Sequence, residues 1–253
     1  MKILTIGDVH GEDIIWKLFD LKLLREFPEL QTDFDYYIFL GDYSDSYVIT
    51  APKIMENLRR IIKLKKNYPD KVILLIGNHD LHYLHSHIAF PCSGYNYLYA
   101  DKIAAIYEEN RELFQPLFYI NNLLFSHAGI SNQWLAGFNK EFGILDEELH
   151  PNAISESYYQ NVLPDQLNAY TSIFDVGISR GGDCRVGGIF WADFSETSSD
   201  IVPGWHQIVG HTPVKEIKRF QIDKTNIELG SITYINTIPA TEEVSKIAYA
   251  LEV

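Results

Sequence analysis

Short apolar runs that each end beside a potential metal ligand recur along the chain, and this pattern constrains the fold more than any other feature. In the first half they are residues 2–7, 36–41, 71–77 and 123–126, each with the length of a buried strand. The segments at their ends are Gly-Asp-Val-His-Gly at 7–11, Gly-Asp-Tyr-Ser-Asp at 41–45, Gly-Asn-His-Asp at 77–80 and Ser-His-Ala-Gly at 126–129, and Gly-His-Thr at 210–212 follows a later run. Because ligand sites in open α/β sheets form at the carboxyl ends of strands, the five segments are expected to converge on one crevice.

Amphipathic stretches lie between these runs. Apolar residues recur at helical spacing over residues 14–24 and 54–65, and residues 100–114 form a third predicted helix. Strands that alternate with helices indicate a parallel-type sheet covered by helices.

The second half of the chain has a different character. Residues 131–180 are polar and contain Pro151 and Pro164, which predicts an irregular insertion or cap. Short strands are expected at 188–191, 207–209, 232–236 and 247–253, and they suit a second, mixed or antiparallel sheet. Without an internal repeat or flexible linker, residues 1–253 are predicted to form a single domain.

Composition limits the partners and the location. The net charge of −13 argues against binding to a nucleic-acid backbone, which needs a cationic face. The sequence contains no run of 18 apolar residues, so no membrane span is predicted, and the apolar start is too short for a signal peptide. Cys92 and Cys184 have no metal-like spacing, so a cytoplasmic protein with two free thiols is expected.

The ligand types at the strand ends suit a divalent cation. On an extended segment, Asp8 and His10 point to the same side and would grip one ion as a pair. Carboxylate, imidazole and amide groups together favour manganese, iron or zinc over calcium. One such segment alone would be an ordinary surface turn, but five at successive strand ends indicate a shared site.

Taken in order, the five segments resemble the calcineurin-like metallophosphoesterase superfamily, and most closely its phosphoprotein phosphatase branch with the bacterial and phage relatives. The matching motifs extend over residues 7–212. The resemblance implies an α/β (α+β) fold, a β-sandwich of two mixed sheets flanked by helices, with a dinuclear metal centre at the strand ends.

The resemblance also implies roles for individual residues. Asp8 and His10 would hold the first metal, and Asp42 would bridge both ions. The complete implied ligand set is Asp8, His10, Asp42, Asn78, His127 and His211. His79 would be the catalytic histidine, paired with Asp45, and Asn78 would also contact the substrate phosphate.

This ligand set implies two divalent cations, with manganese expected first and iron or zinc as alternatives. Two cations acidify a bridging water, which attacks the phosphorus atom. His79, next to a metal ligand, would then protonate the leaving oxygen as the general acid. Asp45 would orient its ring and favour the imidazolium, although a role for Asp45 as a turn residue stays open.

Some positions depart from the pattern of the phosphoprotein phosphatases. Ser46 and Tyr47 stand where Arg-Gly is typical, so one phosphate-binding guanidinium is missing, and Arg180 or Arg185 would replace it. Asp80 stands where most members have glutamate. Residues 235–237 are expected to be structural, and so are the histidines at 82, 85 and 87, with lining of the site as their alternative.

Three functions follow from these observations. The first is a metal-dependent phosphomonoesterase, similar to the serine/threonine protein phosphatases, that acts on phosphoproteins or small phosphate esters. The second is a phosphodiesterase or dinucleotide polyphosphate hydrolase, such as a symmetrical diadenosine tetraphosphatase, which the changes at Ser46 and Asp80 favour slightly. The third is a non-catalytic phosphate-binding scaffold, which the complete ligand set disfavours.

Overall fold

The computed structural model describes residues 1–13, 16, 34–85, 92–144, 150–161, 171–237 and 248–252. They belong to two compact units, the first built from residues 1–115, 213–216 and 235–253, and the second from residues 116–212 and 217–234. Apart from residue 16, the predicted helix at 14–24 lies outside the described residues, as does the histidine at 87. A single domain stays a prediction.

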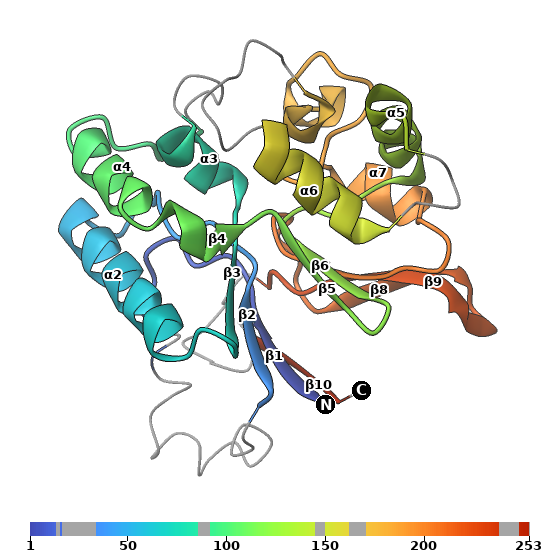
Figure 1. The fold of residues 1–253 in the computed structure, drawn as a ribbon, viewed down its shortest axis with the longest axis horizontal. Coiled ribbons are helices and arrows are strands. Elements are labelled where there is room, and N and C mark those ends of the chain that lie inside the picture. Colours follow the sequence, from blue (N-terminus) through green and yellow to red (C-terminus); the bar gives the residue numbers. More distant parts are fainter. Residues whose placement is uncertain are drawn as a thin grey trace. The chain divides into compact units, whose positions relative to one another are not determined.

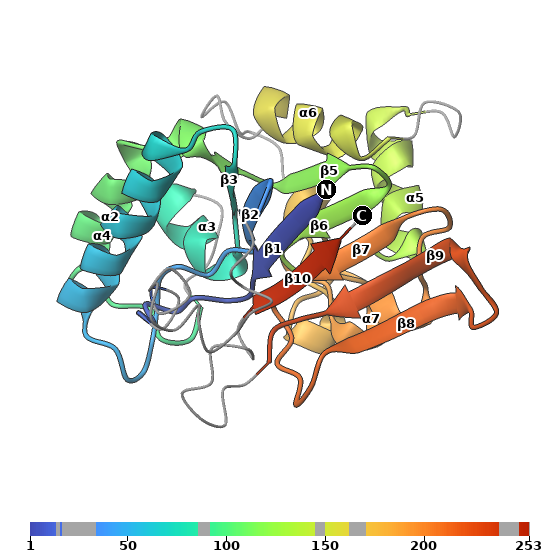
Figure 2. The ribbon, with the colours of Figure 1, turned by 90° about the horizontal axis from the view of Figure 1, so that it is seen from below.

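The first unit contains a five-stranded mixed sheet in the order β10-β1-β2-β3-β4. Its strands are β1 (Lys2–Ile6), β2 (Tyr36–Phe39), β3 (Val72–Leu75), β4 (Phe114–Gln115) and β10 (Ala248–Glu252). β1 to β4 run parallel, whereas β10 pairs antiparallel with β1 in a register that places Lys2 opposite Glu252 (Figure 2). The parallel strands therefore direct the segments that follow β1, β2 and β3 to the same edge of the sheet.

Helices accompany this sheet within the first unit (Figure 1). They are α2 (Ala51–Asn67), α3 (Asn78–Leu84), α4 (Ala100–Glu108) and the 3-10 turn η3 (Arg111–Leu113). α2 buries Ile54, Leu58 and Ile61 along one face, as the apolar spacing predicts. The helix predicted over residues 100–114 is too long, because the chain leaves α4 after Glu108 and enters β4.

The second unit contains another five-stranded mixed sheet, in the order β5-β6-β7-β9-β8. Its strands are β5 (Leu117–Ile120), β6 (Leu123–Ser126), β7 (His206–Val209), β8 (Lys218–Asp223) and β9 (Asn226–Tyr234). Asn121 and Asn122 close the β5–β6 hairpin with φ angles of 49° and 63°, the left-handed values that a tight hairpin turn requires. β6 runs parallel to β7, so the segments after both strands lie at the same sheet edge.

Helical segments fill much of the chain between β6 and β7. They are α5 (Asn132–Phe142), α6 (Pro151–Asn161), η5 (Ser172–Phe174), η6 (Ile178–Arg180) and α7 (Phe194–Ser199). The expectation of an irregular stretch at 131–180 is therefore wrong for α5 and α6. The strand expected at 188–191 is a turn, in which the amide groups of Trp191 and Ala192 both donate to the carbonyl of Gly188.

Among the described residues, no helix has the length and apolar character needed to cross a membrane.

Candidate metal centre and acid–base pair

The loops that follow β1 and β2 are joined through their backbones. The amide groups of Val9 and His10 donate to the carbonyl of Asp42 over 3.1 and 2.6 Å, and Gly11 donates to Tyr43. His10 and Asp42 have left-handed φ angles of 44° and 53°. Such conformations are costly for residues other than glycine and concentrate at functional sites, which fits a role for both side chains.

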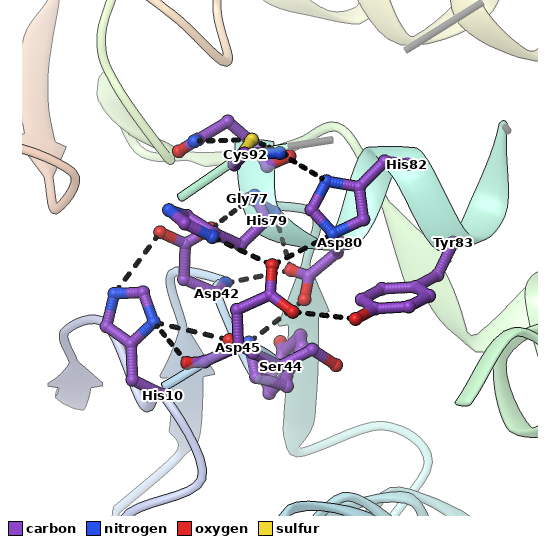
Figure 3. Close-up of polar contacts among 12 residues, drawn as sticks. His10, Asp42, Ser44, Asp45, Gly77, His79, Asp80, His82, Tyr83 and Cys92 are labelled. Atoms are coloured by element: carbon purple, nitrogen blue, oxygen red, sulfur yellow. Dashed lines mark hydrogen bonds and ion pairs between the residues drawn. The ribbon is translucent and has the colours of Figure 1, made fainter. Parts of the chain in front are cut away.

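Backbone carbonyls fix the ring of His10. Its Nδ1 lies 3.2 Å from the carbonyl oxygen of Ser44 and 3.0 Å from that of Asp45, so Nδ1 carries a proton and donates it. The other nitrogen, Nε2, lies 3.6 Å from Oδ2 of Asp42 (Figure 3). A histidine that donates through one nitrogen to a carbonyl while the other faces a carboxylate has the arrangement of a metal ligand.

Electrostatics around His10 also favour a positive charge. Burial opposes the imidazolium, but the carboxylates of Asp42 and Asp8 outweigh burial and raise the pKa of His10 above its ordinary value. The Nε2 lone pair and a carboxylate oxygen repel each other unless a proton or a cation lies between them. Ring or carboxylate atoms of His10, Asp42 and His79 lie within 4.8 Å of one another, a separation that fits a bound ion.

Asn236 orients the first predicted ligand. Its Nδ2 donates to Oδ2 of Asp8 over 2.6 Å, although 228 positions separate the two residues in the sequence. Residues 235–237 were expected to be structural only, and the contact shows that one of them holds a candidate ligand.

The loops that follow β2 and β3 contact each other closely. A Cβ atom on Gly41 would collide with the backbone of Gly77, and one on Gly77 would collide with Asp42, so both positions require glycine. The amide of His79 donates to Oδ1 of Asp42 over 2.9 Å. This contact places the predicted bridging carboxylate at the N-terminus of α3, where the helix dipole favours negative charge.

The carboxylate of Asp80 accepts hydrogen bonds from the same two loops. Its Oδ2 accepts from the amides of Asp42 and Gly77, both over 2.8 Å, and its Oδ1 accepts from the amide of Tyr43 over 2.9 Å and the hydroxyl of Tyr107 over 2.6 Å. Asp80 is fully buried. It is therefore a structural carboxylate that shapes the site.

His79 and Asp45 form the predicted pair. Nδ1 of His79 lies 3.0 Å from Oδ2 of Asp45, which leaves Nε2 on the opposite side of the ring. Burial disfavours the imidazolium, but Asp42 and Asp45 outweigh burial and raise the pKa of His79 to about 9. Burial works against ionised Asp45 as well, yet hydrogen bonds from its neighbours, His79 foremost, lower its pKa. In the metal-free protein these shifts favour an imidazolium paired with a carboxylate at neutral pH, as a general acid requires.

Two further side chains reach Asp45. Nε2 of His82 lies 2.9 Å from its Oδ2, and the hydroxyl of Tyr83 donates to its Oδ1 over 2.6 Å (Figure 3). His82 was expected to be an ordinary helix-face histidine, and Tyr83 was not considered. The three-residue spacing of His79 and His82, which brings side chains to one helix face, is the signal that would have found His82.

Asn78 begins α3 and is buried. Its Nδ2 lies 3.5 Å from Sγ of Cys92, whose thiol in turn lies 3.5 Å from the carbonyl of Asn78. Burial, with Asp42, Asp45 and Asp80 nearby, raises the pKa of Cys92 to about 12, so the thiol stays protonated. With the amide nitrogen on sulfur, the amide oxygen is the end of Asn78 suited to a cation.

In the second unit, His127 and His211 lie together. Nε2 of His127 is 3.0 Å from Nδ1 of His211, and the amide of Gly210 donates to the carbonyl of His127 over 2.8 Å. Two nitrogens that each bind one ion at about 2.1 Å lie roughly 3 Å apart at a right-angled corner of its coordination shell. His211 also has a left-handed φ angle of 59°. The pair therefore fits two ligands of one cation.

The two candidate phosphate-binding arginines differ in their surroundings. Arg180 ends η6, its Nε lies 2.8 Å from Oδ2 of Asp193, and its guanidinium donates to Oγ1 of Thr212 over 2.5 Å. Thr212 follows His211, so Arg180 lies beside a candidate ligand loop. Arg185 is exposed.

A family model for calcineurin-like phosphoesterases matches residues 1–229. The chain belongs to the calcineurin-like phosphoesterase family. The family is one of metal-dependent phosphoesterases, and its fold, two mixed sheets with helices, confirms the fold class predicted from the five segments.

Individual family relatives differ in what they are named for. A symmetrical bis(5'-nucleosyl)-tetraphosphatase of Psychromonas ingrahamii is 33% identical over 145 residues, which are 53% of this chain and 46% of that protein. The match thus spans less than half the length of this curated relative. Crystal structures of a cold-active protein tyrosine phosphatase from a Shewanella species share the fold, one with a TM-score of 0.57 at 17% identity over 99% of this chain and 75% of the other. Another structure of a cold-active protein tyrosine phosphatase gives a TM-score of 0.59 at 17% identity, with 99% and 73% covered.

Proposed function

We propose that this family member hydrolyses phosphate monoesters of proteins or small molecules, with two divalent cations as cofactors and His79 as the general acid. The observation that carries the proposal is the pair of part-exposed His79 and buried Asp45 beside His10 and Asp42. A protonated imidazole held at a candidate cation site by a carboxylate is the arrangement needed to assist a poor leaving group.

We infer that the cation ligands are Asp8, His10, Asp42 and Asn78 in the first unit and His127 and His211 in the second. When bound, two cations supply an acidified water and neutralise charge on the phosphoryl oxygens. The ring orientation of His10, the Asn236 contact to Asp8 and the nitrogen spacing of the histidine pair all support this assignment. Manganese is the first expected resident ion, with iron and zinc as alternatives, because a mixed set of carboxylate, amide and imidazole donors suits all three.

The role of His79 follows from the leaving group. A serine, threonine or sugar alkoxide is strongly basic and must receive a proton as its bond to phosphorus breaks. Nδ1 of His79 is engaged with Asp45, so its Nε2 proton is the one to be delivered. A nucleotide leaving from a polyphosphate is far less basic, and a general acid is correspondingly less useful there. A general acid held by Asp45 therefore favours monoesters of alcohols as the substrates.

Arg180 is the preferred phosphate contact. Its ion pair with Asp193 and its hydrogen bond to Thr212 hold the planar guanidinium beside the His211 loop, and a fixed guanidinium binds phosphate with two parallel hydrogen bonds. Arg185 is the weaker choice because the structure leaves it exposed.

A dinucleotide polyphosphate hydrolase is the second candidate. The similarity to a symmetrical bis(5'-nucleosyl)-tetraphosphatase favours it, as does the loss of an arginine at Ser46. In that reaction the leaving group is a nucleotide, which is weakly basic. Protonation by His79 would therefore accelerate the reaction less.

A panel of substrates separates the two candidates. Purified protein with manganese is assayed on a phosphoserine peptide, p-nitrophenyl phosphate, bis-p-nitrophenyl phosphate and diadenosine tetraphosphate. The highest kcat/KM on the peptide or on p-nitrophenyl phosphate supports the proposal. Preference for the tetraphosphate or the bis-ester overturns it, and inactivity on all four substrates with metal bound would favour a phosphate-binding scaffold.

A further inference from the structure

The carboxylate of Asp45 is surrounded by three side chains, only one of which the acid–base role requires. His79 and His82 both reach Oδ2, at 3.0 and 2.9 Å, while Tyr83 donates to Oδ1 over 2.6 Å (Figure 3). The side chain of Asp45 is only 1% exposed. Water therefore has little access to the carboxylate, and its orientation depends on these neighbours.

The contacts of His82 determine which of its nitrogens carries a proton. The amide of Cys92 donates to Nδ1 of His82 over 3.3 Å, so Nδ1 is an acceptor. Nε2 then carries the proton, and it lies 2.9 Å from Oδ2 of Asp45. The backbone at Cys92 thereby fixes the tautomer of His82 that places the Nε2 proton beside the carboxylate.

Tyr83 is held equally firmly. Its ring stacks on Tyr107 with a centroid distance of 5.9 Å and an interplanar angle of 6°, and on Tyr95 at 5.2 Å and 21°. A ring stacked on two other rings has little freedom to turn. The hydroxyl is thus a fixed donor aimed at Oδ1 of Asp45.

The backbone of Asp45 adopts a conformation that is costly for an aspartate. It lies in the loop between β2 and α2, and its φ angle of 61° is a left-handed value that an aspartate adopts at a cost. In that setting, removing either donor would let the carboxylate rotate away from His79.

We propose that His82 and Tyr83 are positioning residues that lock the carboxylate of Asp45 against His79, in a ring of donors built by α3. The proposal rests on the proposed function, since it assigns how the general acid is held. Both side chains are buried. Both act through Asp45, as supporting partners of a reactive group commonly do.

The test compares Tyr83→Phe in two backgrounds. In the wild-type protein with manganese and a phosphoserine peptide, whose alkoxide leaving group needs a proton, Tyr83→Phe is expected to lower kcat about 10-fold, the usual loss for a supporting contact, with KM unchanged. In an Asp45→Asn background the same change should alter kcat by less than about 2-fold, because the residue through which it acts is already lost. Equal losses in both backgrounds, or no loss in the wild type, would overturn the proposal.

Two further sets of variants separate positioning from folding. Tyr234→Phe removes a hydroxyl from another buried tyrosine, one bonded to Thr197, and should keep full kcat while losing similar thermal stability. His82→Gln places an amide donor near the position of Nε2 and should retain more activity than His82→Leu. If Gln and Leu at this position are equally impaired, donation by His82 is excluded.

A readout without catalysis keeps this proposal separate from the proposed function. Inactivity of the wild-type protein on every phosphate ester would refute the function alone. In metal-free protein, nuclear magnetic resonance then compares how fast the Nδ1 proton of His79 exchanges with water. Faster exchange in Tyr83→Phe than in the wild type supports the proposal, and equal exchange refutes it.

Discussion

Replacement of Asp80 by asparagine should destabilise the protein strongly, because a neutral amide cannot serve four donors. Asparagine keeps the size of the side chain but turns one oxygen into an NH2 group. If the NH2 group takes the place of Oδ2, the backbone amides of Asp42 and Gly77 both lose their acceptor. If it faces the other pair, the Tyr107 hydroxyl can reverse, and only the amide of Tyr43 is orphaned.

The second orientation costs less, and its cost can be estimated. One buried unsatisfied amide, together with weaker bonds to the remaining donors once the charge is gone, amounts to about 3–5 kcal/mol. For a chain of this size the melting temperature should fall by about 10 °C. Because Asp42 and Gly77 lose a shared anchor, affinity for manganese should fall as well.

Differential scanning calorimetry of metal-free protein measures the fall in melting temperature, with Asp70→Asn as the control. Asp70 is exposed, so its replacement should change stability by less than about 0.5 kcal/mol. Should Asp80→Asn melt within about 2 °C of the wild type, the carboxylate is not the anchor described above.

Three other predictions concern the site itself. His79→Ala should lower turnover by roughly 10²–10⁴-fold while metal content, measured by mass spectrometry, is retained; near-normal turnover would exclude His79 as the acid. In metal-free protein His79 should titrate near pH 9, and Asp45→Asn should lower that pKa. The pKa of His79 is higher in the folded than in the unfolded protein. Its contribution to the free energy of unfolding is therefore complete below about pH 6.5 and is lost as pH rises through about 9. If Asp45→Asn left the pH dependence of the unfolding free energy unchanged, this account would be contradicted. Asn236→Ala should weaken manganese binding about 10-fold by releasing Asp8, and an unchanged calorimetric titration would refute that role.

The sequence predicted those parts of the fold that depend on short-range patterns. Apolar runs identify β1, β2, β3 and β6, and the first three runs end in glycine, because a buried strand and its tight exit turn both leave local signals. The edge strand Lys218–Asp223 was missed because it is largely exposed and charged, as edge strands commonly are. The apolar residues 188–191 were mistaken for a strand, since burial in a turn and burial in a sheet look alike in a short segment.

The candidate site was predictable where one motif supplies the residue. His79 lies 3.0 Å from Asp45, and His127 lies 3.0 Å from His211, so each predicted pair is brought together while the roles stay predictions. Asn236 contacts Asp8 from the far end of the chain, and no local pattern announces such a contact. Tyr83 reaches Asp45 because aromatic stacking aims it, which depends on packing that a sequence does not display.

Metal content after reconstitution tests the two-cation site most directly. Wild-type protein loaded with manganese and freed of excess ions should retain about two ions per chain and hydrolyse phosphate esters. Asp42→Asn, which alters the proposed bridging ligand, should retain fewer ions and lose hydrolysis in parallel, whereas Asp70→Asn should match the wild type. Full metal content and activity in Asp42→Asn, or hydrolysis by wild-type protein that holds no metal, would contradict the proposed centre.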